Sequence, residues 1–470
     1  MNHLSDVRRS HVIALCNAAI VLSFAACKAP DRATVDSAGS VASLNDTTAL
    51  ACPDSAGVAS AGLTLPAGFC ANVFAEGVIH GRHVAVAGNG DVYIAIEGTN
   101  PSPKAQPAGT TPPPATSFVA LRDTNRDGRA DLLRRIGTLG NTGVALANGY
   151  VYVDEGTAIV RYARADTALV PAGKREVVVD GFPLTPGHRA RNFVIDTTGS
   201  LFVNVGSATN SCQAKDRALG SPGLEPCTEL LTRAGIWRFD ADRPGQRFNP
   251  EARFASGIRN GMGLAVASDG MLYGTQHGRD QLHDNWPEVF PDVAYQAENP
   301  GEQLIQINQG DDFGWPHCYY SIVERHLVDA PEYGGDGKTT TRCADKKEPR
   351  AVFPAHWAPM SLFIYPTNLA GTDRFPDKYR GGAFIAFHGS WNRTPAPQAG
   401  YRVVFQPLSG GEYITFADGF AGLPADQIQP DRAKHRPVGI AAMPDGSLII
   451  TDDAGGRVYR VTYRNPAAMR

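Results

Sequence analysis

The sequence predicts an all-β protein, and more specifically a six-bladed β-propeller. Its 470 residues include 50 glycines and 34 prolines but few long amphipathic stretches, a composition typical of many short strands joined by turns. A turn followed by an alternating apolar strand recurs six times with uneven spacing. Six copies of a unit that cannot bury both of its faces alone are expected to pack on one another around an axis. The six turns fall at Gly90, Gly149, Gly199, Gly270, Gly382 and Gly446.

The clearest copy of this unit is the segment 187–207, which reads GHRARNFVIDTTGSLFVNVGS. It begins with a basic loop around His188, continues as a short apolar strand, turns at Gly199 and ends in a second alternating strand. A basic loop precedes a strand, a turn and a strand of similar length again at 256–278 and at 434–453. This repetition favours a shared role for the basic loops over a set of unrelated surface residues.

The first 27 residues are expected to form a targeting segment. A basic start is followed by an apolar run over 12–26, which is too short to span a bilayer comfortably and ends in small residues. The residues before Cys27 resemble a bacterial lipoprotein signal, in which this cysteine becomes the lipid-anchored first residue. Because Phe24 stands where leucine is usual, ordinary cleavage to a soluble product is the alternative. Either route gives an exported protein, periplasmic or attached to the cell envelope.

The rest of the chain divides into a linker and a single domain. Residues 28–62 are rich in Ala, Ser, Asp and Thr and contain no aromatic residue, which is typical of a flexible linker. Strand and turn patterns follow, so we expect the propeller, as the catalytic domain, over residues 63–465. The net charge of −3 gives no reason to expect nucleic acid as a partner.

Six cysteines remain once Cys16 and Cys27 are set aside, and they fall into three couples that are close in sequence. An exported protein meets an oxidising compartment, so disulfide bonds are the default expectation. Metal binding is not favoured, because no C-x-x-C spacing occurs. Fifteen pairings exist in principle, and the simplest is Cys52–Cys70, Cys212–Cys227 and Cys318–Cys343.

Two stretches allow two interpretations each. The loop 123–131 has the oxygen spacing of a calcium site, but its twelfth position is Arg134 and not a bidentate glutamate, so a plain Asp/Gly turn is the alternative. Its candidate ligands are Asp123, Asn125, Asp127 and Asp131. The insertion 311–360 is rich in aromatic residues and holds the third cysteine couple. Those aromatic residues either line a pocket or form a small core of their own.

The basic loops are the candidate functional site. Equivalent points of all blades meet at one end of a propeller's channel, so loops that are distant in sequence converge there. Many cations around one axis repel one another unless an anion lies among them, and guanidinium groups bind carboxylates in bidentate fashion. We therefore expect a compact polycarboxylate ligand with a planar face against Trp391 or Trp357. The loops before strands contribute Arg82, His83, His188, Arg191, Arg259, Asn260, His435 and Arg436, and those after strands His277, Gly278, Asp280, His388, Trp391 and Arg393.

The motifs in these loops resemble the family of pyrroloquinoline-quinone-dependent (PQQ-dependent) glucose/sorbosone dehydrogenases, especially its sorbosone-dehydrogenase-like branch. The resemblance covers about Leu63 to Tyr463. It implies a six-bladed propeller that carries PQQ, a tricarboxylate, at the channel mouth with calcium nearby, a small sugar or aldehyde substrate, and a quinone or cytochrome as electron acceptor. The motifs are Gly187–Ser207, Ser256-Gly257-Ile258-Arg259-Asn260, Gly314-Trp315-Pro316, Tyr379–Phe384, His388-Gly389-Ser390-Trp391-Asn392-Arg393 and Arg436-Pro437-Val438-Gly439.

The resemblance also implies roles for single residues. His188 matches the general base, which takes the substrate hydroxyl proton while hydride passes to the quinone. Arg259, with a catalytic role, and Asn260 match the pair at the quinone carbonyls, and Arg436 matches a carboxylate clamp. Gly278 matches a segment whose carbonyls bind calcium.

Further positions carry over less directly, and some depart from the family pattern. Asp280 is a candidate side-chain ligand of the calcium, and Arg191 and Trp391 complete the expected cofactor site. Ser207 stands where the glucose dehydrogenases have an aspartate beside the base, and His277 replaces a glutamine. The lysine of their quinone clamp aligns near Gly389, so His388 or Arg393 is its expected substitute.

Two other functions remain open for a propeller of this kind. A metal-dependent lactonase needs carboxylates that converge on a cation at the channel, whereas the loops here are basic. A non-catalytic propeller at the cell surface would bind peptides or glycans. PQQ uptake together with reduction of a dye by sugar is expected of the dehydrogenase alone.

Overall fold

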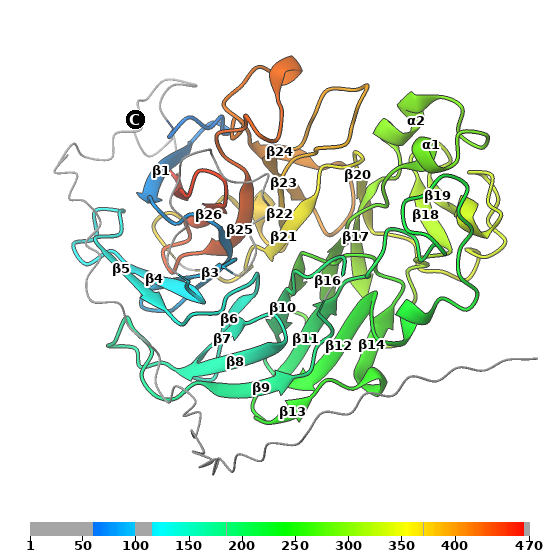
Figure 1. Ribbon diagram of the computed structural model, residues 1–470. Helices are drawn as coiled ribbons and strands as arrows, with labels where there is room; N and C mark the ends of the chain where they lie inside the picture. Colours follow the sequence, from blue (N-terminus) through cyan, green and yellow to red (C-terminus); the bar gives the residue numbers. More distant parts are fainter. Residues whose placement is uncertain (1–59, 99–114, 185, 370, 465–470) are drawn as a thin grey trace, which may run out of the picture. The chain divides into compact units, whose positions relative to one another are not determined.

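The protein folds as a ring of β-sheets. The computed structural model describes residues 60–98, 115–184, 186–369 and 371–464, and all of them lie in one compact unit, Arg32–Arg470. Their strands form six blades and one separate two-stranded sheet (Figure 1). The predicted all-β class and six-bladed propeller are therefore confirmed. Within the described residues, no helix is both long and apolar enough to cross a membrane.

In each of the first three blades the strands run in chain order from the channel outward. They are β2 (Gly81–Val86), β3 (Val92–Ile96), β4 (Phe118–Arg122) and β5 (Leu132–Ile136) in blade one; β6 (Val144–Ala147), β7 (Tyr150–Asp154), β8 (Ala158–Ala163) and β9 (Glu176–Asp180) in blade two; and β10 (Phe193–Ile195), β11 (Ser200–Val205), β12 (Gly235–Asp240) and β14 (Arg253–Ser256) in blade three.

The last three blades follow the same rule, except that the final blade takes its outer strand from the start of the domain. They are β15 (Leu264–Val266), β16 (Leu272–Gln276), β17 (Glu302–Ile307) and β20 (Ala351–Phe353) in blade four; β21 (Pro359–Ile364), β22 (Ala383–Phe387), β23 (Arg402–Gln406) and β24 (Ile414–Ala417) in blade five; and β25 (Pro437–Ala442), β26 (Leu448–Asp452), β27 (Val458–Tyr463) and β1 (Phe69–Ala75) in blade six.

The predicted turns separate the inner strand of each blade from the second strand. Glycine is required there by backbone geometry: Gly199, between β10 and β11, has a φ of +86°, which side chains with a Cβ rarely adopt. The inner strands contact one another around the ring, and apolar side chains from each pair of neighbouring blades form a shared core. Each blade thus buries its faces against its neighbours, as the repeat predicts.

Strand β1 closes the ring by pairing antiparallel with β27. Phe69 lies opposite Tyr463 and Asn72 lies opposite Arg460. The ring of Phe69 makes edge contacts with Phe375 and Phe416, so the closing strand is also held by the core between blades five and six. Closure leaves the outer edge of β27 fully paired, which removes a site where other chains would add.

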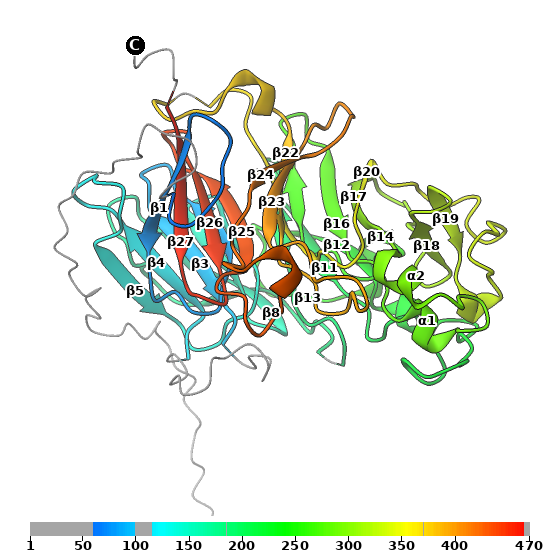
Figure 2. The same ribbon diagram turned by 90° about the horizontal axis from the view of Figure 1, so that it is seen from above.

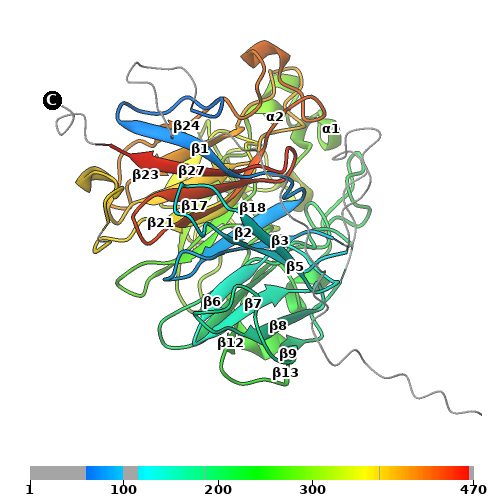
Figure 3. The same cartoon turned by 90° about the vertical axis from the view of Figure 1, so that its left-hand side faces the viewer.

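Blades two and three are joined by an additional strand. The connection after β12 contains β13 (Gln246–Arg247), which pairs in parallel with β9 of blade two (Figure 3). Gln246 holds this connection in shape, because its amide nitrogen donates to the backbone oxygens of Asp240 and Arg243.

Long insertions cover the outer side of blade four. The helices α1 (Leu282–Asn285) and α2 (Val293–Glu298) lie near the hairpin of β18 (Cys318–Ser321) and β19 (His326–Asp329) (Figures 1 and 2). Phe290 and Tyr319 are buried in a core of this insertion. The short 3-10 helices of the chain are η1 (Thr228–Leu231), η2 (Pro250–Ala252), η3 (Pro331–Tyr333), η4 (Asp377–Tyr379) and η5 (Ala425–Gln427).

Two of the predicted disulfides are present. Cys212–Cys227 closes the long loop after β11, and Cys318–Cys343 holds the hairpin insertion. Cys70 is also disulfide-bonded. Its predicted partner Cys52, the signal segment with Cys27, the linker up to residue 59 and the loop 99–114 lie outside the described residues.

Buried threonines connect neighbouring blades. The hydroxyl of Thr451 accepts a hydrogen bond from the Gly439 backbone and donates one to the backbone oxygen of Arg82 in blade one. Thr275 repeats the arrangement between blades four and five, with Gly263 and Pro359 as partners. These hydroxyl groups satisfy backbone groups that would otherwise be buried without partners.

We expect Thr451→Val to destabilise the protein by about 2 kcal/mol, because it leaves both backbone partners of the hydroxyl unsatisfied. Urea unfolding at neutral pH measures this change. Thr415→Val on the exposed edge of β24 is the control, with an expected change of at most about 0.5 kcal/mol. Equal stabilities of Thr451→Val and the wild-type protein would contradict the assignment.

Candidate active site

One end of the channel carries most of the predicted site. Here the inner strands begin and the second strands end, and we call the loops at this end the mouth. The side chains of Ala190, Met262, Met360 and Val438 pack together at this level and form an apolar floor. The predicted site residues that lie in mouth loops are His188, Arg191, Arg259, Asn260, His277, Gly278, Asp280, His388, Trp391, Arg393 and Arg436.

His188 lies just before β10 and is held by one residue of the same blade. Its Nδ1 lies 3.0 Å from Ser207 Oγ and 3.1 Å from the Ser207 backbone oxygen. The Ser207 hydroxyl donates its own proton to the Thr209 backbone oxygen, 2.7 Å away, so Nδ1 must be the protonated nitrogen that donates to Ser207. Nε2 therefore carries a lone pair, and it has no hydrogen-bond partner among the described residues. Ser207 thus fixes the orientation of the His188 ring.

The surroundings keep His188 neutral. Removal of the ring from water and the nearby charge of Arg259 hold the pKa of His188 well below its usual value. An imidazole that is neutral at working pH is available to accept a proton.

Arg259, at the mouth of blade four, is buried and fully oriented by the protein. Its Nη2 contacts Asp280 Oδ2 at 2.9 Å and Asn210 Oδ1 at 3.0 Å, Nε donates to the Asn210 backbone oxygen, and Nη1 donates to the Gly278 backbone oxygen at 2.7 Å. Four of its five N–H bonds are therefore in use, which fixes the direction of the guanidinium group.

Asp280 is the counter-charge of this arginine. Its Oδ2 also accepts from Arg217, and its Oδ1 accepts from Asn392 at 2.6 Å. Burial alone would raise the pKa of Asp280, but Arg259 and Arg217 outweigh it and hold that pKa well below its usual range. Both carboxylate oxygens are occupied by protein donors, so Asp280 is better suited to hold arginines than to hold the predicted calcium.

Asp280→Asn is expected to destabilise the protein by about 3 kcal/mol at pH 7, because it leaves two arginines without their buried counter-charge. The carboxyl group releases its proton more readily in the folded than in the unfolded chain, where its pKa is about 3.9. Its stabilisation is therefore complete above that pH and is lost as the pH falls further.

Urea unfolding between pH 3 and 7 tests this expectation. The variant should show a shallower loss of stability below about pH 4 than the wild-type protein. Asp166→Asn, in an exposed pair with Arg164, is the control and should change stability by at most about 0.5 kcal/mol. A variant with wild-type stability and the same acid slope would overturn the assignment.

His277 and Asn260 lie next to each other in the mouth loops of blade four. His277 Nε2 donates to the Pro359 backbone oxygen at 3.0 Å, which leaves Nδ1 to accept from the Asn260 amide at 3.4 Å. Burial and the charge of Arg259 lower the pKa of His277 to about 4, so this ring is neutral. Asn260 Oδ1 is buried without a hydrogen-bond partner among the described residues. An orphaned amide oxygen of this kind is a vacant ligand or acceptor position.

Glu302 holds the segment that carries Gly278. Its two oxygens accept the backbone N–H groups of Gly278 and Ala358, at 2.9 and 3.1 Å, and so connect blade four to blade five. The side chain is almost fully buried, and burial raises its pKa to about 8.

A second polar group spans blades five, six and one. His388 Nε2 lies 2.8 Å from Asp453 Oδ1, and Asp453 Oδ2 accepts from Arg82 Nη1 at 2.5 Å. Arg436 does not contact a side-chain carboxylate in this group; it donates to the backbone oxygens of His388 and Gly389. Arg436 Nη1 has no hydrogen-bond partner among the described residues.

Other predicted cofactor residues are differently placed. The Arg191 guanidinium donates to the backbone oxygens of Gly156 and Pro183 and lies over the ring of Phe182, so it supports blade two. Arg393 pairs with Glu298 and donates to the Ala355 backbone oxygen. Their use in ligand binding stays a prediction that these contacts do not favour.

The two tryptophans differ sharply in exposure. Trp391 is 60% exposed, while Trp357 is only 7% exposed and is packed in the core between blades four and five. Of the two, only Trp391 keeps a free ring face for a planar ligand. The aromatic insertion does both of the things that were expected as alternatives. Tyr319 is buried with Phe290 in the insertion's own core, and Trp315, Tyr319 and Tyr320 also line a small cavity beside Arg259, His277 and Gly278.

The cations at the mouth are only partly balanced by carboxylates of the protein. Asp280 is shared by Arg259 and Arg217, and Asp453 pairs with Arg82. These two carboxylates relieve part of the repulsion on which the expectation of an anionic ligand was based. A carboxylate ligand still finds an unused donor at Arg436.

The loop 123–131 forms a hydrogen-bonded turn. Asp123 accepts from the Gly128 backbone, Asp127 from the Arg129 backbone, and Asp131 from the backbone and hydroxyl of Thr124. In the described part of the chain, the carboxylates of this loop do not gather into a group of metal ligands. Calcium binding by this loop, in which Asn125 donates to Asp127, stays a prediction.

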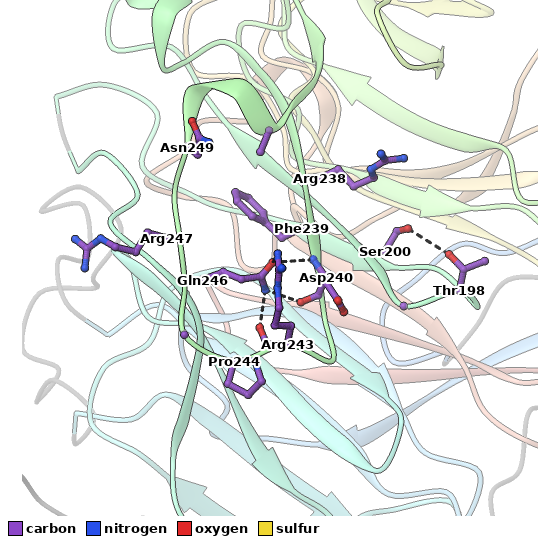
Figure 4. A pocket seen from close by; sticks show the side chains of 13 residues that line it. Thr198, Ser200, Arg238, Phe239, Asp240, Arg243, Pro244, Gln246, Arg247 and Asn249 are labelled. Carbon is purple, nitrogen blue, oxygen red and sulfur yellow. Dashed lines mark hydrogen bonds between the residues drawn. The ribbon is translucent and has the colours of Figure 1, made fainter.

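A pocket of about 760 Å³ lies at the opposite end of blade three, around the turn at Gly199 and the connection that contains β13 (Figure 4). Arg238, Arg243 and Arg247 line it but point in different directions, and Arg243 is bonded to Gln246. These side chains do not converge on a common ligand, so the mouth remains the candidate active site.

Three residues of the site were missed by sequence reasoning. Asn210 holds both Arg259 and Asp280, Glu302 holds Gly278, and Asp453 holds His388. Asp453 stands directly after the repeated strand pair at 434–453, so its position at the mouth could have been read from the repeat. Asn210 and Glu302 carry no such signal.

The protein is thus a six-bladed β-propeller with an oriented imidazole and a fixed arginine at one end of its channel. Residues 63–464 match the TrAA12-like family, and the chain belongs to that family. The resemblance to PQQ-dependent sugar dehydrogenases is thereby confirmed.

Individual relatives agree with the family. The chain is 25% identical over 344 residues to a PQQ-dependent sugar dehydrogenase of Hypocrea jecorina, covering 68% of this chain and 73% of that protein. It is 25% identical over 268 residues to a PQQ-dependent pyranose dehydrogenase of Coprinopsis cinerea, covering 48% and 34%. An uncharacterized protein of Borreliella burgdorferi is 30% identical over 218 residues, covering 44% and 48%. The chain thus spans about half or less of the length of the latter two relatives.

Solved structures share the fold. The holo form of the pyranose dehydrogenase PQQ domain from Coprinopsis cinerea superimposes with a TM-score of 0.66 at 18% identity, covering 85% of this chain and 97% of that domain. The calcium structure of a Trichoderma reesei enzyme of family AA12 gives 0.67 at 17% identity, covering 86% and 97%.

Proposed function

We propose that the protein is a PQQ-dependent oxidoreductase that oxidises a sugar or a sugar-derived alcohol or aldehyde, with His188 as the general base. Family membership and the named sugar dehydrogenases among its relatives support the cofactor and the broad substrate class. The observation that carries the catalytic assignment is the tautomer of His188, whose Nδ1 is held by Ser207 while Nε2 keeps its lone pair.

The residues at the mouth fit a flat, acidic cofactor. Arg436 Nη1 and the fifth N–H of Arg259 are donors for carboxylate or carbonyl oxygens, and the exposed ring of Trp391 is a surface for stacking. These groups would hold PQQ, and the quinone supplies the acceptor for hydride when it is bound.

The chain's own residues carry the proton chemistry. His188 Nε2 accepts the proton of the substrate hydroxyl, and Ser207 stabilises the resulting imidazolium by accepting a hydrogen bond from Nδ1. Arg259 provides a fixed positive charge next to this step, and because Asn210 and Asp280 already orient it, no reorganisation is needed during the reaction. The apolar floor below the mouth keeps bulk water out from the channel side.

Calcium completes the proposal. The backbone oxygen of Gly278 and the unpartnered Oδ1 of Asn260 are hard oxygen ligands of the type calcium prefers. Glu302 fixes the Gly278 segment and so would set the position of the ion.

The compartment and the electron acceptor extend the same proposal. The two disulfides support work outside the cytoplasm, in the periplasm or at the cell envelope. We infer that electrons leave to a membrane quinone or a cytochrome, and that Cys27 anchors the chain to lipid. Labelling with radioactive palmitate, lost in Cys27→Ser, tests the anchor.

Titration of the purified protein with PQQ, with and without calcium, tests the cofactor. We expect stoichiometric uptake seen as a change in quinone absorbance, followed by reduction of a dye when members of a sugar and aldehyde panel are added. Absence of both uptake and dye reduction would overturn the proposal. Hydrolysis of lactones by metal-loaded protein would instead indicate the lactonase alternative, and neither activity would indicate a binding propeller.

A further inference from the structure

We propose that His388, oriented by Asp453, is a second proton acceptor of the active site, which serves the return of the cofactor to its oxidised form. This inference rests on the proposed function and extends it. It gives the mouth two bases with separate tasks, His188 for the substrate hydroxyl and His388 for the proton that remains when electrons leave.

The geometry of His388 is that of an oriented base. A carboxylate can only accept, so the 2.8 Å contact with Asp453 Oδ1 requires the proton on His388 Nε2. The lone pair is then on Nδ1, which has no hydrogen-bond partner among the described residues. Nδ1 is not one of the fully buried atoms that lack a partner, so it keeps some exposed surface. The His388 side chain keeps 15% of its surface exposed, so a proton released at the mouth can reach it.

The surroundings suit a group that gains a proton for a short time. Asp453 stabilises the imidazolium through the shared hydrogen bond, as the aspartate of a catalytic triad does. Arg82, bonded to Asp453, and Arg436, bonded to the His388 backbone oxygen, oppose a lasting positive charge. His277 of the neighbouring blade four also interacts electrostatically with His388.

The chemical balance of the reaction leaves a second proton for a base to accept. Oxidation of an alcohol carbon releases two electrons and two protons, of which one comes from the hydroxyl group and goes to His188. The other leaves carbon as part of hydride. When an acceptor that takes electrons alone, such as ferricyanide or an oxidised haem, removes the two electrons, this proton is left behind. His188 is held by neutral Ser207 and has already been used, whereas His388 is backed by a carboxylate and is free.

A neighbouring pair provides the matched control. His435 Nδ1 lies 2.6 Å from Asp452, so it is also a histidine with a carboxylate partner. Its ring, however, packs edge-on against Tyr459 of β27, the third strand from the channel, and Asp452 is occupied by backbone N–H groups. His435→Gln therefore removes a similar pair outside the channel.

The first test separates the two half-reactions by stopped flow in PQQ-loaded protein. His388→Gln should slow reoxidation by ferricyanide about 10²-fold, and it should slow reduction by sugar far less than that. Asp453→Asn should show the same selectivity to a smaller degree, and His435→Gln should alter neither half-reaction. Equal slowing of both half-reactions by His388→Gln, or unchanged reoxidation, would overturn the inference.

The second test does not depend on activity. Nitrogen-15 NMR of histidine side chains in the cofactor-free protein should show His388 protonated at Nε2 and bare at Nδ1, and Asp453→Asn should disturb that tautomer. A proton on Nδ1 in the wild-type protein would refute the dyad. If the protein takes up no PQQ, the proposed function fails, while this spectrum still reports on the dyad itself.

Discussion

The variant His188→Gln is expected to turn over sugar about 10³-fold more slowly than wild type while binding PQQ equally well. Glutamine fills a similar volume and can still donate to Ser207, but it has no lone pair basic enough to take the hydroxyl proton. Dye-linked turnover and a PQQ titration measure the two quantities separately. The result would show that the imidazole acts in the chemical step and not in holding the cofactor.

Ser207→Ala is the companion variant. The Ser207 backbone oxygen still accepts from Nδ1, so only part of the orientation is lost and a decrease of about tenfold is expected. Normal turnover in His188→Gln would show that the base lies elsewhere at the mouth. A loss of PQQ binding in the same variant would place the histidine in the cofactor site instead.

Arg259→Lys should weaken PQQ binding and lower turnover by about 10²- to 10³-fold, although the positive charge is kept. Lysine cannot bond Asn210, Gly278 and Asp280 at once, so the fixed geometry of the fork disappears. A PQQ titration and dye-linked kinetics at saturating cofactor distinguish the two effects.

Arg161→Lys provides the comparison for an arginine that is similarly buried but distant from the mouth. Arg161 is 7% exposed, against 4% for Arg259, and pairs with Glu176 at the outer side of blade two. Arg161→Lys should lower the stability of the protein and leave PQQ binding and dye-linked turnover unaltered. Unchanged kinetics in Arg259→Lys would make Arg259 a structural partner of Asp280 only.

The fold could be predicted because its signals are local. Each blade repeats a turn and an alternating strand, and a glycine such as Gly199 marks a backbone conformation that other residues avoid. The period of two along each strand then assigns one set of side chains to each neighbouring blade. The cross-blade pairing of β13 with β9 was not predictable, because two residues carry too little pattern to indicate a strand.

The candidate site was predictable only in outline. Residue type and place in the repeat located His188, Arg259 and His388 at one end of the channel. The contacts of each guanidinium group depend on the conformation of the loops around it. The sequence therefore does not show that Arg191 donates to backbone oxygens while Arg259 pairs with Asp280. The partners that decide these roles come from other blades or from insertions.

The closing strand has a consequence for how the chain can be rearranged. Because Phe69 faces Tyr463, the two ends of the domain emerge next to each other at the rim of blade six. A short peptide could join them, and new ends could then be opened between any other two blades without removing a single strand pair. In such permuted proteins, a different blade would be the last to be synthesised and to complete the ring. Comparing their refolding rates with that of the wild-type protein would measure how much the final ring closure delays folding.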